Sequence, residues 1–258
     1  MRKPGMVLFA IVVGFMSLAV RSAVADDFRV ETEVYVEKET QPVSENLTLF
    51  QSGVVYDFEL TAPEEVTIYD TGRGQIVLLD PSRRVRTTIT SEQLLQYVAE
   101  LKARAAEGKS HLKFLAEPKL TPTFEQSTNT LTLASDVLTY TAKGAAPKDA
   151  SATMRYREFA DWSARLNSTR PGRLPPFARL ELNRTLAEKS LIPSEVQLKL
   201  EPESHLAGQA RTLKSKQTFT WRLLESDQQR IARAGAQSTE FEAVTLAKFR
   251  QLGPAVQK

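Results

Sequence analysis

Strict alternation of apolar and polar side chains dominates the first third of the chain and restricts what it can fold into. In residues 28–39 (FRVETEVYVEKE), every second residue from Phe28 to Val36 falls on one face, and charged residues dominate the other. A period of two with β-branched residues predicts a strand with one solvated face. Five more short segments of β character follow before residue 90, separated by turns: 46–51, 54–60, 66–69, 75–79 and 85–89. Closely spaced strands of this kind predict an antiparallel meander.

The periodicity changes after residue 90. Leu94, Leu95, Val98 and Leu101 recur at helical spacing, which predicts an amphipathic helix over residues 91–107 with Thr90 or Ser91 as its N-cap. We expect this stripe to pack on the concave side of the sheet. Later patterns predict four strands, two helices, two strands and a final helix, in this order: 112–115, 120–126, 130–133, 137–142, 153–166, 175–188, 196–200, 211–224 and 227–252.

The order of these segments indicates the fold class. Strands and helices do not alternate regularly, so the chain is expected to be α+β rather than a doubly wound sheet. The predicted architecture is an antiparallel curved sheet, or half-barrel, with helices packed on it. We expect one β-rich domain over residues 26–258, with the Gly/Ala/Pro loop at 143–150 as a candidate boundary.

Residues 1–25 have the layout of a secretory signal peptide. Basic residues near the start precede an apolar run at 6–20, and the small residues Ala23 and Ala25 occupy the −3 and −1 positions of a cleavage site. The run is shorter than the roughly 20 residues that a spanning helix needs. We therefore expect cleavage after Ala25, export to the periplasm or the medium, and no transmembrane anchor in the mature chain.

Charge and cysteine usage limit the classes of partner. Three of the 34 basic residues lie in the leader, so the mature chain carries equal numbers of basic and acidic residues. The basic footprint of a nucleic-acid-binding protein is missing, so no nucleic-acid partner is expected. The chain has no Cys. A chain of this length can bury a sufficient core without disulfides.

The segment Asp70-Thr71-Gly72 resembles the D-T-G signature of aspartic proteases. Their chemistry needs two carboxylates that share one proton. Here Arg73 stands where a small residue is usual, and the chain has no second D-[TS]-G. We expect instead a hairpin turn in which Asp70 acts as a cap and Gly72 and Gly74 adopt positive φ.

Other catalytic and metal-binding patterns are missing from the sequence. The two histidines, His111 and His205, have no partner at ligand spacing, so no metal site is predicted. There is no glycine-rich phosphate loop and no nucleophile elbow, so we expect no cofactor and no enzymatic activity. A hydrolase that uses Asp57, Asp70 and Asp80 is the open alternative.

Aromatic residues are the remaining candidates for a binding surface. Five of them could line a cavity for a lipid or another apolar ligand: Phe58, Phe159, Trp162, Phe219 and Trp221. The alternative is that these side chains are ordinary members of the core.

Residues 54–89 resemble part of the LolA-like lipoprotein-carrier group. The shared feature is a run of alternating strands with a turn that bears Asp and Gly, here Ile68-Tyr69-Asp70-Thr71-Gly72, followed by residues 76–81 and 83–88. The resemblance implies an unclosed β-barrel with helices over its open side and an apolar cavity for acyl chains. The group usually begins with a helix, whereas this chain begins with a strand, and no functional residue carries over.

Besides the hydrolase, two non-catalytic interpretations of function remain. The first is an exported non-catalytic protein that binds a lipid or another apolar ligand in the curved sheet. The second is a structural or protein-interaction module of the cell envelope with a filled core. An apolar cavity of several hundred Å3 would favour the first. A filled core beside an exposed apolar patch would favour the second.

Overall fold

The computed structural model describes residues 27–108, 110–201 and 212–251. The expected signal peptide, His205 and Arg211 lie outside the described residues. The strands are β1 Phe28–Val36, β2 Ser44–Gln51, β3 Val54–Glu59, β4 Val66–Asp70, β5 Gln75–Asp80, β6 Val85–Thr90, β7 Thr121–Glu125, β8 Thr130–Ala134, β9 Leu138–Ala145, β10 Ile192–Leu200, β11 Thr212–Thr220 and β12 Glu242–Ala243. The helices are α1 Ser91–Ala106, α2 Ser110–Ala116, α3 Ala150–Asn167, α4 Phe177–Glu188, α5 Glu225–Glu240 and α6 Leu246–Gln251, with a short 3-10 turn, η1, at Thr71–Arg73.

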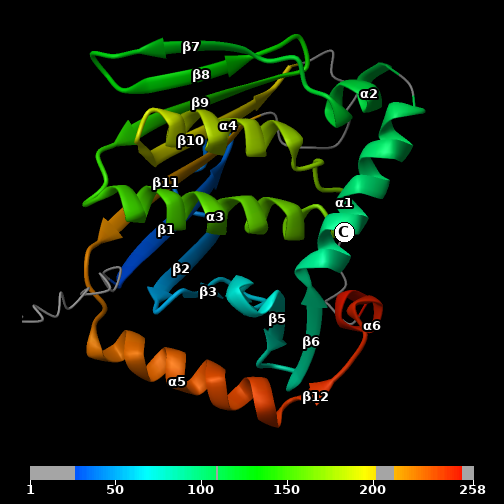
Figure 1. Cartoon of the computed structure of the whole chain (residues 1–258), viewed down its shortest axis with the longest axis vertical. Coiled ribbons are helices and arrows are strands. Elements are labelled where there is room, and N and C mark those ends of the chain that lie inside the picture. The colour runs from blue at the N-terminus through cyan, green and yellow to red at the C-terminus, as the bar shows by residue number, and fades with distance from the viewer. Residues whose placement is uncertain (1–26, 109, 202–211, 252–258) are drawn as a thin grey trace, which may run out of the picture.

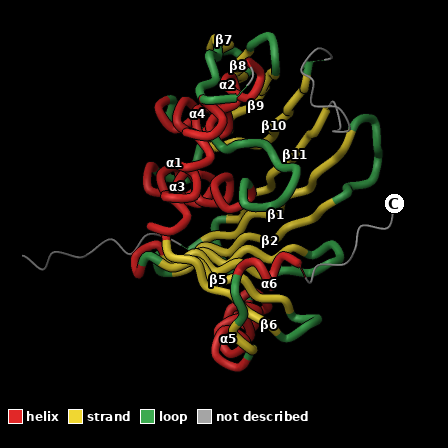
Figure 2. Tube along the Cα trace, turned by 90° about the vertical axis from the view of Figure 1, so that its right-hand side faces the viewer, coloured by secondary structure: helices red, strands yellow, loops and turns green. Residues whose placement is uncertain are grey.

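All the strands form one sheet in the order β12-β6-β5-β4-β3-β2-β1-β11-β10-β9-β8-β7. Strand β1 lies in the middle, between β2 and β11, and every pair is antiparallel except β12 with β6. The sheet is curved and does not close (Figures 1 and 2). The α+β class and the antiparallel curved sheet with packed helices are therefore confirmed. Strands from both sides of the loop at 143–150 belong to this sheet, while the number of domains stays a prediction.

Helices cover the two faces of the sheet unequally. Helices α1, α3 and α4 lie together on one side, which we call the inner face (Figure 2). Helix α3 covers β1 and β2 through Phe28, Val30 and Phe50, and α4 covers β8 to β10 in a separate leucine-rich cluster. Helix α5 packs on the opposite, outer face of β2 to β5.

Alternation along each strand decides which residues meet which helix. Leu47 and Leu49 of β2 face α5 in the outer cluster, whereas Phe50 faces α3. On β5, Leu79 joins the outer cluster and Leu78 joins the inner one. Because both faces of these strands are covered, the middle of the sheet is buried on two sides.

The first predicted helix has the expected start and packing. Thr90 and Gln93 form a reciprocal capping box at the N-terminus of α1. Leu94 and Val98 are buried, as predicted, while Leu101 is only half-buried. Leu94 packs with Tyr69 and Leu78, so the helix covers the inner face of the sheet.

Two segments differ from the predictions. The expected strand at 112–115 is part of helix α2, because a short apolar run cannot distinguish a strand from a buried helical turn. The expected helix at 227–252 is interrupted after Glu240. Phe241 adopts extended backbone and is buried in the outer cluster, and Glu242–Ala243 then pairs in parallel with β6 before α6 begins.

Candidate functional site

A cluster of aromatic rings fills the space between α3 and the inner face. Phe28 of β1 stacks on Phe50 of β2 with ring centroids 4.1 Å apart. Phe159 of α3 meets Phe50 edge-on at 5.6 Å and Tyr69 of β4 edge-on at 5.4 Å. Phe219 stacks on Trp221 at 5.6 Å. Offset and edge-on ring contacts of this kind stabilise a core beyond their buried area.

The structure brings together four of the five predicted aromatic residues. Phe159, Phe219 and Trp221 belong to the cluster under α3, and Trp162 follows one turn after Phe159 and packs in the neighbouring inner-face cluster. Phe58 lies apart from them, on the outer face under α5. The alternation along β3 predicts which residues of this strand lie on the same face as Phe58. It does not predict that this face is the outer one, because the packing of α5 decides that.

A small cavity opens beside the aromatic cluster, next to α3. Its volume is about 140 Å3. Tyr69, Phe159 and Trp162 form its aromatic side, and its polar lining comes from Thr71, Arg155 and Glu158. The Thr71 hydroxyl donates a hydrogen bond of 2.8 Å to Glu158, which ties η1 to α3. The opening accepts a group about as large as benzene, since an engineered cavity of about 150 Å3 binds benzene.

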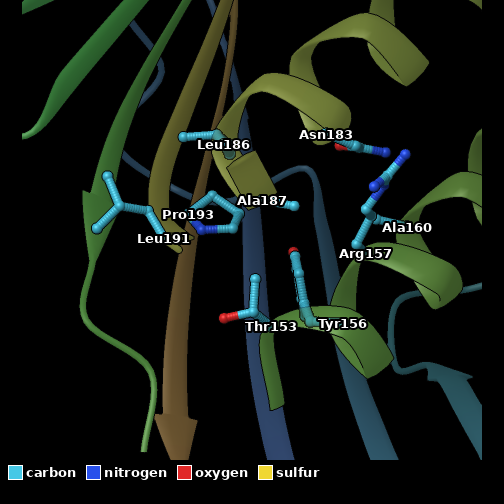
Figure 3. A pocket seen from close by; sticks show the side chains of 9 residues that line it. All are labelled: Thr153, Tyr156, Arg157, Ala160, Asn183, Leu186, Ala187, Leu191 and Pro193. Carbon is cyan, nitrogen blue, oxygen red and sulfur yellow. The ribbon is translucent and has the colours of Figure 1, made fainter. Parts of the chain in front are cut away.

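A second cavity lies between α3, α4 and the start of β10 (Figure 3). Tyr156 and Thr153 project into it from α3, while Leu186 and Ala187 line it from α4. The hydroxyl oxygen of Thr153 is buried there without a hydrogen-bond partner. The volume is about 10 Å3, which is the space of a single water molecule. This cavity is too small to be a ligand site.

Next to the aromatic zone, the inner face becomes polar. Cross-strand pairing aligns Gln217 of β11 with Thr32 of β1, Thr32 with Asn46 of β2, and Asn46 with Glu59 of β3. The amide of Glu59 donates a hydrogen bond of 2.9 Å to the carbonyl of Glu65, just before β4. We call these five residues the polar row. They share the face of Phe28 and Phe50 because side chains alternate along each strand.

Asp57 lies between the polar row and the aromatic cluster. The Thr48 hydroxyl donates a hydrogen bond of 2.8 Å to its carboxylate. The pKa of Asp57 is raised from 3.8 to about 6, chiefly because burial disfavours the charged carboxylate. The charges of Glu59 and Glu65 add to this rise, whereas the Thr48 hydrogen bond and the charge of Arg170 oppose it. Burial also raises the pKa of Glu59, although hydrogen bonds from Ser44 and Asn46 oppose the shift.

Glu65 joins two remote parts of the chain to this end of the sheet. Arg170, in the loop between α3 and α4, binds one carboxylate oxygen at 2.5 Å. Arg250 of α6 binds the other oxygen at 2.9 Å. Two cations on one carboxylate hold both the loop and the C-terminal helix against the start of β4.

The acids of the hydrolase alternative do not face one another. Asp57 pairs across the sheet with Thr67, in the middle of β4. Asp70 begins η1 and accepts a hydrogen bond from the amide of Arg73. Asp80, at the far end of β5, accepts hydrogen bonds from Ser82 and Arg83 that lower its pKa despite burial. Each of the last two therefore has a local structural role in a turn.

No family model and no curated protein matches the chain. The fold and the inner face by themselves define an α+β protein with an unclosed, helix-covered sheet. Within the described ranges, no helix combines the length and hydropathy needed to cross a membrane. The same ranges hold no group of three or more His, Cys, Asp or Glu side chains arranged around a metal position.

Sequence reasoning missed the polar row and the Glu65 contacts. The available signal was the phase of the alternation: Thr32, Asn46 and Thr48 occupy the same phase as buried apolar residues of their strands. Polar residues in an inward phase are uncommon unless they are paired or functional. The partners Arg170 and Arg250 leave no such signal, because they lie more than 100 residues away from Glu65.

Proposed function

We propose that the mature protein is an exported, non-catalytic binding protein that takes an apolar or amphiphilic ligand on the inner face of its sheet. The observation that carries this proposal is the aromatic cluster beneath α3, which opens to a cavity at Tyr69, Phe159 and Trp162. Aromatic side chains with a few polar groups at the rim are the usual lining of small-molecule sites. The LolA-like resemblance of residues 54–89 and the signal-peptide layout of residues 1–25 support the same proposal.

Size limits what the site can hold in the observed conformation. Its volume of about 140 Å3 is below the range of about 300–1,000 Å3 that is typical of ligand pockets. A ring or the end of an acyl chain fits, whereas a whole lipid needs α3 to move. Beside the cavity, the hydrogen bond from Thr71 to Glu158 holds α3 against η1.

The second candidate is a structural or interaction module of the cell envelope with a filled core. The dense ring packing under α3 favours it, as does the small volume of both cavities. The two candidates differ in one measurable property: a filled core excludes the ligand, whereas a binding site admits it and is blocked when the cavity is filled.

Native mass spectrometry of the purified mature protein tests the proposal directly by detecting a co-purified lipid. Binding of the fluorescent probe N-phenyl-1-naphthylamine gives a second measure. Val55→Trp places an indole in the cavity and should abolish probe binding, since Val55 lines it. Val43→Trp is the matched control, because Val43 is 47% exposed and is not among the cavity residues.

A bound lipid, or probe binding that Val55→Trp alone removes, supports a ligand site. No co-purified lipid together with probe binding that both variants leave unchanged favours the filled-core module. Export has its own test. N-terminal sequencing of exported material should find Asp26 first, and a start at Met1 would contradict cleavage after Ala25.

A further inference from the structure

The cavity beside α3 is lined by three aromatic rings. Phe159 lies edge-on to Tyr69, with an angle of 86° between the ring planes and ring centroids 5.4 Å apart. Trp162, one turn further along α3, lines the same cavity. Tyr69 is buried, whereas Phe159 and Trp162 are half-buried, so part of each ring stays accessible to a ligand. Rings around one small space can surround a positively charged group with π-electron density.

One carboxylate stands beside these rings. Glu158 directly precedes Phe159 on α3 and also lines the cavity. Its Oε1 accepts the hydrogen bond from the Thr71 hydroxyl, which holds the side chain at the cavity. The negative charge of Glu158 therefore adds to the attraction that the rings exert on a cation.

The cation of the lining, Arg155, has aromatic neighbours of its own. Its guanidinium lies over Phe28 and Phe50, 5.1 and 5.7 Å from the ring centroids. Neither of these two rings is among the cavity residues. Of the cavity rings, Trp162 has Arg165 over it at 5.1 Å, while no cation of the described residues lies over the other two.

We infer that this cavity binds a quaternary ammonium group, such as the trimethylammonium head of choline. The inference rests on the proposed function, because it names the ligand class of the same cavity. A trimethylammonium group has no N–H and needs no hydrogen-bond acceptor, so aromatic walls suit it. A primary ammonium has three donors to satisfy, and the polar lining offers it few oxygens. In bulk the group is comparable to benzene, which a cavity of about 150 Å3 accepts; the volume here is about 140 Å3.

This head group occurs both in free choline and in choline phospholipids. Arg155 offers the phospholipid a second contact, since guanidinium groups bind phosphate oxygens. The acyl chains would stay outside, because the cavity is too small to hold them together with the head group.

Calorimetric titration of the mature protein at pH 7.5 and constant ionic strength compares choline with 3,3-dimethyl-1-butanol, its uncharged isostere with carbon in place of nitrogen. Choline should bind about fivefold or more tightly, because only the cation gains from the ring faces. Dihexanoylphosphatidylcholine below its critical micelle concentration identifies the source of the group. Tighter binding than choline indicates a phospholipid ligand, and equal or weaker binding indicates a free choline-type solute.

Two variants test the parts of the site. Glu158→Gln removes the charge but keeps an oxygen for the Thr71 hydrogen bond, so it should weaken choline binding and leave the alcohol unchanged. Trp162→Leu keeps an apolar wall without a π-face and should also reduce the preference for choline. Glu45→Gln is the matched control, since Glu45 is an exposed carboxylate outside the cavity lining.

Circular dichroism checks that each variant is folded, and Glu158→Gln alone decides if Trp162→Leu is not. Equal affinity of the parent for choline and the alcohol, or a preference that neither variant reduces, would overturn the inference. A parent that binds N-phenyl-1-naphthylamine without preferring choline keeps the proposed function and loses only this ligand class. A parent that binds neither the probe nor choline loses both.

Discussion

Arg29 of β1 and Asp227 of α5 form an ion pair across the outer face, with one guanidinium nitrogen 3.0 and 3.2 Å from the two carboxylate oxygens. Asp227 is 1% exposed and also accepts a hydrogen bond from the amide of Leu224, so it closes the first turn of α5. Arg29 contacts a second acid, Glu31, at 2.6 Å, but that side chain is 54% exposed.

The two acids on Arg29 should therefore differ in importance. Asp227→Ala removes the buried partner of Arg29, leaving only the exposed Glu31, and also removes the cap on Leu224, so it should lower the free energy of unfolding by about 3–5 kcal/mol. Glu31→Ala removes an exposed pair and should cost less than about 1 kcal/mol. Urea denaturation of both variants measures the difference, and equal losses would show that burial does not decide the strength of these pairs.

Phe58 should be a core residue rather than a ligand contact. It is 7% exposed and packs on the outer face with Leu47 and Ile231. Phe58→Ala should cost about 3–5 kcal/mol of stability and leave probe binding unchanged in the folded protein. Leu60→Ala is the control, since Leu60 is 41% exposed. A loss below about 1 kcal/mol for Phe58→Ala would contradict the observed burial.

Asp57 should make stability fall as the pH rises. Its pKa is raised from 3.8 to about 6 in the folded protein. Between these two values the native state holds a proton that the unfolded chain has lost, so ionisation favours unfolding. Asp57→Asn should therefore melt at a higher temperature than the parent at pH 7.5, and the difference should shrink towards pH 4.

Thermal unfolding of both proteins from pH 4 to 8 measures this difference. Other acids, such as Asp80 with its lowered pKa, are present in both proteins and largely cancel in the comparison. Glu45→Gln is the control: Glu45 is exposed, so this variant should show no comparable gain in melting temperature at pH 7.5. If the melting temperatures of the parent and of Asp57→Asn change with pH in the same way, then Asp57 is not held in a desolvated environment.

Asp70 should behave as a turn residue. Its carboxylate accepts a hydrogen bond of 3.2 Å from the amide of Arg73, and an Asn side chain can accept the same bond. Asp70→Asn should change stability by less than about 0.5 kcal/mol. Gly74→Ala should cost about 1 kcal/mol or more, since Gly74 has a φ of +65° and a Cβ there would lie 3.1 Å from Ser91 Oγ.

The same variant tests the protease alternative. The mature protein is incubated with a denatured protein substrate at acid pH, and we expect the substrate to remain intact. Cleavage by the parent that disappears in Asp70→Asn would make this turn an active site and would overturn the non-catalytic proposal.

The amino-acid sequence by itself determined the elements whose signals are local. The alternation from Phe28 to Val36, the capping box at Thr90 and the turn at Asp70 each depend on a few consecutive residues, and the structure has them where they were predicted. Within that turn Gly74 has the predicted positive φ, whereas the prediction for Gly72 was wrong, because Gly72 lies inside the 3-10 turn. The α+β class follows from the order of such elements. Short or interrupted signals were less informative, as the strand predicted at 112–115 shows.

Only the tertiary structure decided which elements meet. Strand β1 pairs with β11, nearly 200 residues away, and this pairing completes the polar row by setting Gln217 opposite Thr32. Packing of α5 assigned Phe58 to the outer face, and Glu65 gained partners from a distant loop and helix. Alternation tells which residues of a strand share a face. Which face is covered, and by what, depends on contacts between remote segments, because burial is a property of the whole packed chain.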